Sequence, residues 1–209
     1  MNNMNSDTVI KNYEEHGALL RGHFLLSSGL HSDAYLQSEC IMQDPANAKK
    51  VVSGLVDMLK DLDFTTIVSP AIGGIRFGYE LASQMNKRTL FTERVDGIMT
   101  FRRGFTLKKG EKVLVAEDVV TTGKSTKECI KAVEEAGGIV TGIASIIDRS
   151  SGTAGFTVPF YPLAAVDVKS YNVEECPMCK EGIPCVKPGS RVFAKWNSYG
   201  NNYCCQKTY

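Results

Sequence analysis

VLVAEDVVTTGKST, residues 113–126, joins an apolar segment to two neighbouring acids and a loop of small hydroxyl residues. Residues 112–116, KVLVA, are almost continuously apolar, which predicts a strand buried on both faces of a parallel sheet. Residues 125–136 have helical spacing, and Gly137 and Gly138 can supply the left-handed conformation that ends a helix. The stretch therefore predicts a strand, a ligand-binding loop and a helix, in that order.

The same alternation of strand-like and helix-like segments continues on both sides of this stretch. Asp44 and Pro45 are typical of a helix N-cap and first helical position, so a helix is expected through residue 62. Another helix is expected at residues 74–86. Further strands are expected at residues 65–69, 88–92, 139–147 and 163–168. This order predicts an α/β fold with a mostly parallel sheet flanked by helices, and ligands beyond the carboxyl ends of its strands.

Length and composition limit the class of protein. A chain of 209 residues is long enough for one α/β domain and short for two, so residues 1–209 are expected to form a single domain. Its 24 basic and 23 acidic residues leave a net charge of +1, which indicates neither nucleic acid nor a membrane as a partner. The amino terminus lacks the pattern of a secretory signal, so we expect a cytoplasmic protein whose seven cysteines are reduced.

Residues 117–125 carry the candidate chemistry. The loop at residues 121–125 can offer backbone N–H groups, hydroxyls and a helix N-terminus to a monoester phosphate. The carboxylates of Glu117 and Asp118 suit a pair of neighbouring hydroxyls rather than that same phosphate. The segment therefore predicts a site for a ribose 5-phosphate.

Two nucleotide-binding motifs are excluded by their spacing. A Walker loop ending at Ser125 would require glycine at the position of Asp118. The glycines Gly73, Gly74 and Gly78 do not have the spacing of the dinucleotide fingerprint.

At these residues the sequence resembles the type I phosphoribosyltransferases, whose signature is a hydrophobic strand, two acids and a loop rich in Thr and Gly. Residues 113–125 match the signature throughout. Over most of its length the chain is similar to the orotate-specific members of that family. The similar segments are GHFLLSSGLHSDAYLQ at residues 22–37, SPAIGG at 69–74, RRGF at 102–105 and the pair Asp148-Arg149.

The resemblance implies a Rossmann-like core at residues 44–170, with a small hood formed by the chain termini. Residues 1–43 would be the amino-terminal part of the hood, and residues 171–209 a Cys-rich tail. The implied reaction transfers the ribose 5-phosphate group of 5-phosphoribosyl 1-diphosphate (PRPP) to orotate, giving orotidine 5'-phosphate and pyrophosphate in UMP synthesis. The implied cofactor is Mg²⁺, held mainly by oxygens of the donor, so no protein side chains dedicated to a metal are expected there.

The resemblance also implies roles for individual residues. PRPP would be bound by Glu117, Asp118, Val119, Val120, Thr121, Thr122, Gly123, Lys124 and Ser125. Its pyrophosphate would lie against Ala71, Ile72, Gly73 and Gly74, where members of the family often have a cis non-proline peptide. Orotate would contact Thr121 and Arg149, because a planar guanidinium suits a carboxylate. The implied catalytic residues are Arg94, Arg102 and Asp118.

A basic loop within residues 93–112 would close over the site of the neighbouring subunit, so the resemblance implies a homodimer with shared sites. A solvated basic hairpin is the alternative for the loop's cations other than Arg94, which matches the arginine at the family's loop entry. For Arg149 the alternative is a salt bridge with Asp148 or Asp167.

Two other functions remain open. A purine phosphoribosyltransferase would share residues 117–125 but would have no reason for Arg149. A regulator that senses PRPP on the same fold should carry a basic face or an added DNA-binding module, which the charge and the segment order do not indicate.

The tail contains a Cys cluster, C-x2-C-x5-C, formed by Cys176, Cys179 and Cys185. It is half of a zinc-binding pattern, and a loop of unligated thiols is the favoured interpretation because no second pair completes it. The histidines, at positions 16, 23 and 31, show no ligand spacing, so structural or surface roles are expected for them.

Overall fold

The computed structural model describes residues 6–26 and 29–188, and the chain divides into two units. The core unit combines the amino-terminal segment through Ala18 with Gln37–Asp167, and the hairpin unit combines Leu19–Leu36 with the chain from Val168 onward. The expected amino-terminal hood part, residues 1–43, is thus divided between the two units. A single domain over residues 1–209 stays a prediction.

Six strands of the core unit form one sheet in the order β5-β4-β3-β6-β7-β8. All neighbouring pairs are parallel except β4 and β5, which are antiparallel. The strands are β3 (Thr66–Pro70), β4 (Arg88–Val95), β5 (Ile98–Phe101), β6 (Lys112–Val120), β7 (Ile139–Asp148) and β8 (Phe160–Ala165). The predicted α/β class with a mostly parallel sheet is confirmed.

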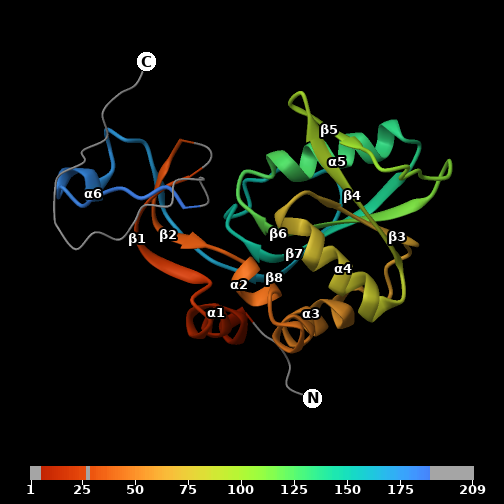
Figure 1. Ribbon diagram of the computed structural model, residues 1–209, viewed down its shortest axis with the longest axis horizontal. Helices are drawn as coiled ribbons and strands as arrows, with labels where there is room; N and C mark the ends of the chain where they lie inside the picture. The colour runs from red at the N-terminus through yellow and green to blue at the C-terminus, as the bar shows by residue number, and fades with distance from the viewer. Residues whose placement is uncertain (1–5, 27–28, 189–209) are drawn as a thin grey trace. The chain divides into compact units, whose positions relative to one another are not determined.

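Helices cover both faces of this sheet, with α3 and α4 on one side and α5 on the other (Figure 1). The helices of the core unit are α1 (Ser6–Glu15), α2 (Glu39–Met42), α3 (Pro45–Leu59), α4 (Gly73–Met85) and α5 (Lys124–Glu135). As predicted, the Asp44 side chain caps α3 by accepting a hydrogen bond from the Ala46 N–H at 3.0 Å. Among the described residues no helix is long and apolar enough to cross a membrane.

Two glycines let α4 pack directly on the sheet. A Cβ on Gly74 would lie 3.0 Å from the Ala116 carbonyl oxygen, and a Cβ on Gly78 would collide with Ser69 Oγ. Helix α4 therefore approaches β3 and β6 more closely than side chains of ordinary size allow. This packing brings the amino-terminal end of α4 next to the carboxyl-terminal part of β6.

Strand β6 is longer than the sequence indicated. It continues beyond Ala116 through Val120, because β7 pairs with it along its length and Val120 lies opposite Asp148. Glu117 and Asp118 therefore belong to the strand itself rather than to the loop after it. A backbone rigidly paired to its neighbour holds both acids.

Strand β5 was not predicted; a basic hairpin was only the alternative for residues 93–112, and β4 and β5 do form a hairpin. Asp96 and Gly97 form its tight turn, with φ of 51° and 81°. Two positive φ values at the turn are typical of type I′ turns, for which Asp-Gly is a favoured pair. The Asp96-Gly97 dipeptide was the sequence signal from which this turn could have been predicted.

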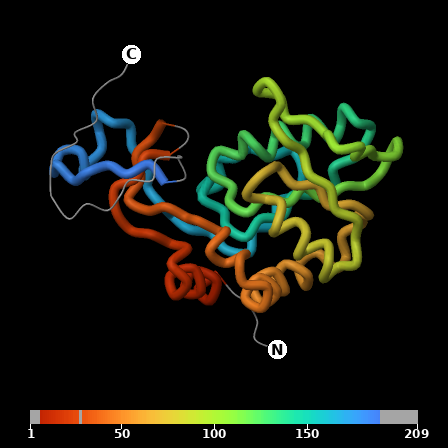
Figure 2. The backbone as a smooth tube through the Cα atoms, viewed as in Figure 1, coloured from red at the N-terminus to blue at the C-terminus, as the bar shows by residue number. Residues whose placement is uncertain are grey.

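The hairpin unit contains a three-stranded sheet in the order β1-β2-β9. Its elements are β1 (Leu19–Leu25), β2 (His31–Leu36), β9 (Ser170–Tyr171) and α6 (Pro177–Lys180). Figure 2 shows the amino-terminal hairpin beside the last described part of the chain, and Phe24 pairs with Val186. The rest of the predicted Cys-rich tail, including Cys204 and Cys205, lies outside the described residues.

Candidate active site

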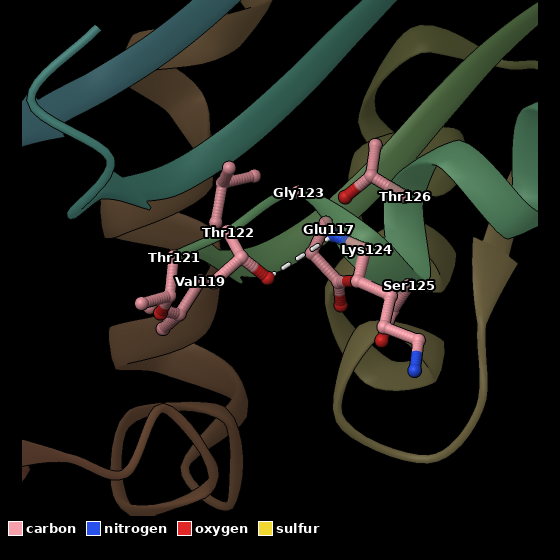
Figure 3. A pocket seen from close by; sticks show the side chains of 9 residues that line it. Glu117, Val119, Thr121, Thr122, Gly123, Lys124, Ser125 and Thr126 are labelled. Carbon is pink, nitrogen blue, oxygen red and sulfur yellow. Dashed lines mark hydrogen bonds between the residues drawn. The ribbon is translucent and has the colours of Figure 1, made fainter. Parts of the chain in front are cut away.

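A pocket of about 140 Å³ lies where β6 meets α5. Figure 3 shows the side chains that gather there. Its lining consists of Glu117, Val119, Val120, Thr121, Thr122, Gly123, Lys124, Ser125 and Thr126. All but Thr126 were predicted from the sequence. The signal for Thr126 was a further hydroxyl residue in the first turn of the predicted helix.

The loop of this pocket is shaped to present backbone N–H groups. Gly123 has a φ of 71°, which favours glycine, and α5 begins directly after it. The first N–H groups of a helix have no carbonyl partner within it, and they stand at the positive end of the helix dipole. The Lys124 N–H already donates to Thr122 Oγ1 at 3.4 Å, within the loop. The pocket can therefore receive an oxyanion from hydroxyls and N–H groups together.

Glu117 and Asp118 experience different surroundings. Glu117 is only 8% exposed, and burial raises its carboxyl pKa well above the ordinary value, with the Asp118 charge and hydrogen bond raising it further. Asp118 is half-buried, and its Oδ1 lies 2.9 Å from the position that a Cβ on Gly73 would take. Asp118 thus lies against the first turn of α4, where the helix dipole favours a negative charge. Both acids belong to β6, but the Glu117 side chain is buried, whereas the Asp118 side chain faces the start of α4.

A second loop, Ala71 and Ile72, connects β3 to α4, and Gly73 and Gly74 are the first residues of that helix. It contains the expected cis peptide, between Ala71 and Ile72. The Ala71 N–H donates to the Thr92 carbonyl at 2.7 Å, which continues the pairing of β3 with β4. Because a Cβ on Gly73 would collide with the Asp118 carboxylate, the residues after β3 lie beside this acid.

Arg149 follows β7 directly, beside the start of the pocket loop. Its backbone N–H donates to the Val120 carbonyl at 2.7 Å, so Arg149 and Thr121 lie on adjacent segments. The Arg149 residue is buried, at 9% exposure. The Asp148 side chain accepts a hydrogen bond from the Ser150 N–H at 2.7 Å. The main chain thus places Thr121 and Arg149 near each other, and the predicted contact of both residues with orotate stays a prediction.

The two predicted catalytic arginines are not among the residues that line the pocket. Arg94 forms an ion pair with Glu128 of α5 and donates to the Gly97 carbonyl at 3.2 Å. Arg102 is exposed directly after β5. The next residue, Arg103, pairs with Glu93 at 3.1 Å. The roles of Arg94 and Arg102 in catalysis therefore stay predictions.

The buried Glu117 carboxyl predicts a specific dependence of stability on pH. Folding raises the pKa of the Glu117 carboxyl, so between the ordinary value of 4.5 and the raised pKa the folded chain keeps the carboxyl protonated while the unfolded chain loses the proton. As pH rises through this range, the Glu117 contribution to the free energy of unfolding should fall by at most about 1.4 kcal/mol per pH unit. Glu117→Gln lacks this group, so its stability relative to wild type should increase from pH 5 to the raised pKa.

Urea unfolding at several pH values measures this difference. Glu134→Gln, which changes an exposed acid on α5, is the matched control and should track wild type in parallel. A constant difference between Glu117→Gln and wild type would show that folding does not raise this pKa.

Comparison with known proteins agrees with the geometry. Residues 41–155 match the phosphoribosyl transferase domain family. An orotate phosphoribosyltransferase of Caldicellulosiruptor bescii is 48% identical over 90% of this chain and 99% of its own length. The structure of orotate phosphoribosyltransferase from Aeropyrum pernix is similar with a TM-score of 0.62 and 26% identity, over 75% of this chain and 93% of that one.

An adenine phosphoribosyltransferase from Thermoanaerobacter pseudethanolicus shares the fold, with a TM-score of 0.56 and 17% identity over 64% of this chain and 88% of that one. The fold alone therefore does not distinguish orotate from adenine phosphoribosyltransferases, whereas the sequence identity does. The chain belongs to the orotate phosphoribosyltransferases, a family built on the phosphoribosyl transferase domain.

Proposed function

We propose that this protein transfers the ribose 5-phosphate group of PRPP to orotate, releasing pyrophosphate and giving orotidine 5'-phosphate for UMP synthesis. The observation that carries the proposal is the pocket between β6 and α5, which is lined by Glu117 and by the residues at the N-terminus of α5. Residues 1–209 would act as one phosphoribosyltransferase domain in the cytoplasm. The 48% identity to a relative named orotate phosphoribosyltransferase supports the choice of reaction.

Each part of the donor has a matching part of the site. The 5-phosphate would take the loop at residues 121–125, where hydroxyls and N–H groups converge. The ribose hydroxyls would donate to Glu117 and Asp118. The pyrophosphate would lie along residues 71–74, and the proximity of Gly73 to the Asp118 carboxylate supports this because it places the two subsites side by side.

The site also fits a magnesium ion that arrives with the donor. Among residues 6–26 and 29–188, no group of three or more metal-ligating side chains lies at the pocket. Mg²⁺ keeps several waters and is commonly held by one or two carboxylates plus substrate phosphates, a demand that Asp118 can meet. When bound, the ion would neutralise charge on the departing pyrophosphate.

Arg149 and Thr121 would hold the acceptor. Orotate brings a carboxylate, and a buried guanidinium is the cation best suited to bind it with two parallel hydrogen bonds. A purine acceptor has no such group, so the position of Arg149 beside the pocket loop favours orotate.

Catalysis needs little covalent help from the protein. The ribose carbon acquires positive charge as pyrophosphate departs, so the chain must stabilise the leaving charge and exclude water. Arg94 near the end of β4 and Arg102 directly after β5 would serve this purpose, with residues 93–112 reaching the partner's site in a homodimer. The ion pair of Arg94 with Glu128 is partly exposed, and such pairs stabilise a structure by only about 0–1 kcal/mol, so binding can break it readily.

The reaction is tested by measuring pyrophosphate release from PRPP and Mg²⁺ with orotate, adenine or guanine as acceptor. Release with orotate alone supports the proposal. Release with a purine instead would favour the purine branch, and PRPP binding without release would favour a sensor.

Asp118→Asn should weaken PRPP binding while the fold remains intact. A hydrogen bond to a charged group contributes about 1.5–3 kcal/mol, so the dissociation constant should rise roughly 10- to 150-fold. Calorimetric titration measures the affinity, and circular dichroism measures the fold. Unchanged affinity in the folded variant would remove Asp118 from the donor site.

Complementation tests the shared sites. Arg94→Ala combined with Arg102→Ala should inactivate one subunit type, and Asp118→Asn the other. After subunit exchange, half of the dimers are mixed and each has one intact site, so about a quarter of wild-type activity should return. Absence of recovery after verified exchange would show that the loop acts in its own subunit.

Arg149→Ala should reduce turnover of orotate and leave PRPP affinity nearly unchanged. Losing one partner of a buried charge pair costs about 2–5 kcal/mol, which is roughly 30- to 5,000-fold in kcat/KM. Arg149→Lys keeps the charge but not the planar fork, so it should recover only part of the loss. Uracil, which lacks the carboxylate, should show a much smaller change, and equal losses for PRPP and orotate would make Arg149 a structural residue.

A further inference from the structure

Four side chains with metal-binding atoms meet inside the hairpin unit. They are His23 on β1, His31 on β2, Cys176 just before α6 and Cys179 within it. One ligand atom from each lies within 4.8 Å of all the others. Cys176 is fully buried, and the two histidines are at most 3% exposed. Cys179 is half-buried, so the cluster lies largely in the interior of a small unit, where apolar side chains would be expected.

The separations are close to the edges of a tetrahedral metal site. His23 Nε2 lies 3.6 Å from Cys176 Sγ and 3.8 Å from Cys179 Sγ, while His31 Nδ1 lies 3.3 Å from Cys179 Sγ. Ordinary zinc–sulfur and zinc–nitrogen bond lengths give a nitrogen–sulfur edge of about 3.6 Å. His23 Nε2 and His31 Nδ1 are closer, at 2.7 Å, than the nitrogen–nitrogen edge of about 3.3 Å. A small rotation of one ring would open this edge.

A hydrogen bond on the side of the ring away from the cluster fixes the orientation of His23. Its Nδ1 lies 2.7 Å from the Ile183 carbonyl oxygen, which can only accept, so Nδ1 carries the proton. The lone pair of Nε2 then faces the cluster. Histidines that bind metals commonly donate their other ring N–H to a carbonyl or carboxylate in this way.

The backbone also positions this ring. The register of β1 against β2 shifts between Arg21 and Phe24, so the two residues in between, Gly22 and His23, stand opposite Asp33. Such a bulge re-aims a side chain, and here it brings His23 beside His31.

We propose that His23, His31, Cys176 and Cys179 bind one Zn²⁺ as a structural site of the hairpin unit. Two thiolates balance the charge of the ion, so the buried group is neutral as a whole. Two sulfur and two nitrogen ligands in a closed arrangement match structural zinc, whereas Mg²⁺ prefers oxygen ligands. Such a site leaves no open position for catalysis, and it is separate from the Mg²⁺ proposed for the donor.

A metal ion would stabilise the hairpin unit by cross-linking its separate segments. The unit is assembled from two chain segments far apart in sequence, and its short strand β9 contributes only two residues to the sheet. Units this small rarely stabilise themselves by apolar burial alone, and metals or disulfides commonly supply the rest. A zinc ion would join β1 and β2 to α6, so its binding free energy would become folding free energy of this unit.

Elemental analysis of the full chain, purified under reducing conditions without added metal, tests the site. Wild type should contain about one zinc per chain, whereas Cys176→Ser, Cys179→Ser and His31→Gln should each retain less than about a tenth. Cys185→Ser is the matched control, because Cys185 belongs to the same tail but not to the group of four. It should retain zinc at the wild-type level.

A second measurement on the wild-type chain avoids dependence on variants that fail to fold. After removal of zinc by a chelator, titration with Co²⁺ should produce the intense visible bands of tetrahedral cobalt and a thiolate charge-transfer band, saturating at about one equivalent. Wild type that contains less than about a tenth of an equivalent of zinc and gives no such spectrum would overturn the site. Zinc loss in Cys185→Ser equal to that in Cys176→Ser would overturn the ligand assignment, and iron in place of zinc would overturn the choice of metal.

Discussion

Parallel pairing of β6 with β3 on one side and β7 on the other determines where every part of the candidate site lies. Because the three strands run in the same direction, the loops that follow them reach the same edge of the sheet. The chain that follows these strands contains Gly73 at the start of α4, the residues 121–125 and Arg149. The glycines of α4 strengthen the arrangement, since they let that helix press its first turn against Asp118.

Local physical chemistry made much of this fold predictable. The apolar run KVLVA, the Asp44 cap and the glycines after α5 each act within a few residues, and each appears as predicted. The full length of β6 was not predictable in that way. Acids are disfavoured in strands, and Glu117 and Asp118 are held there by pairing with β7, a partner that local sequence does not reveal. The ion pair of Arg94 with Glu128 likewise joins residues 34 apart.

The hairpin unit shows the same limit more strongly. The C-x2-C pair was visible in the sequence, but its partners are 148 and 153 residues away, on a hairpin near the other end of the chain. Spacing rules recognise ligands that come in short local pairs. His23 and His31 become neighbours only because two antiparallel strands place them diagonally on one face. Only the assembled backbone makes the four side chains one group.

The hydrogen bond from the Arg149 N–H to the Val120 carbonyl fixes where the main chain of residue 149 lies beside the pocket loop. It involves only main-chain atoms, so it persists whichever side chain stands at residue 149. The spacing between the loop after β6 and the loop after β7 is therefore a property of the sheet. Substitution of the side chain at residue 149 would therefore leave the distance between these two loops unchanged.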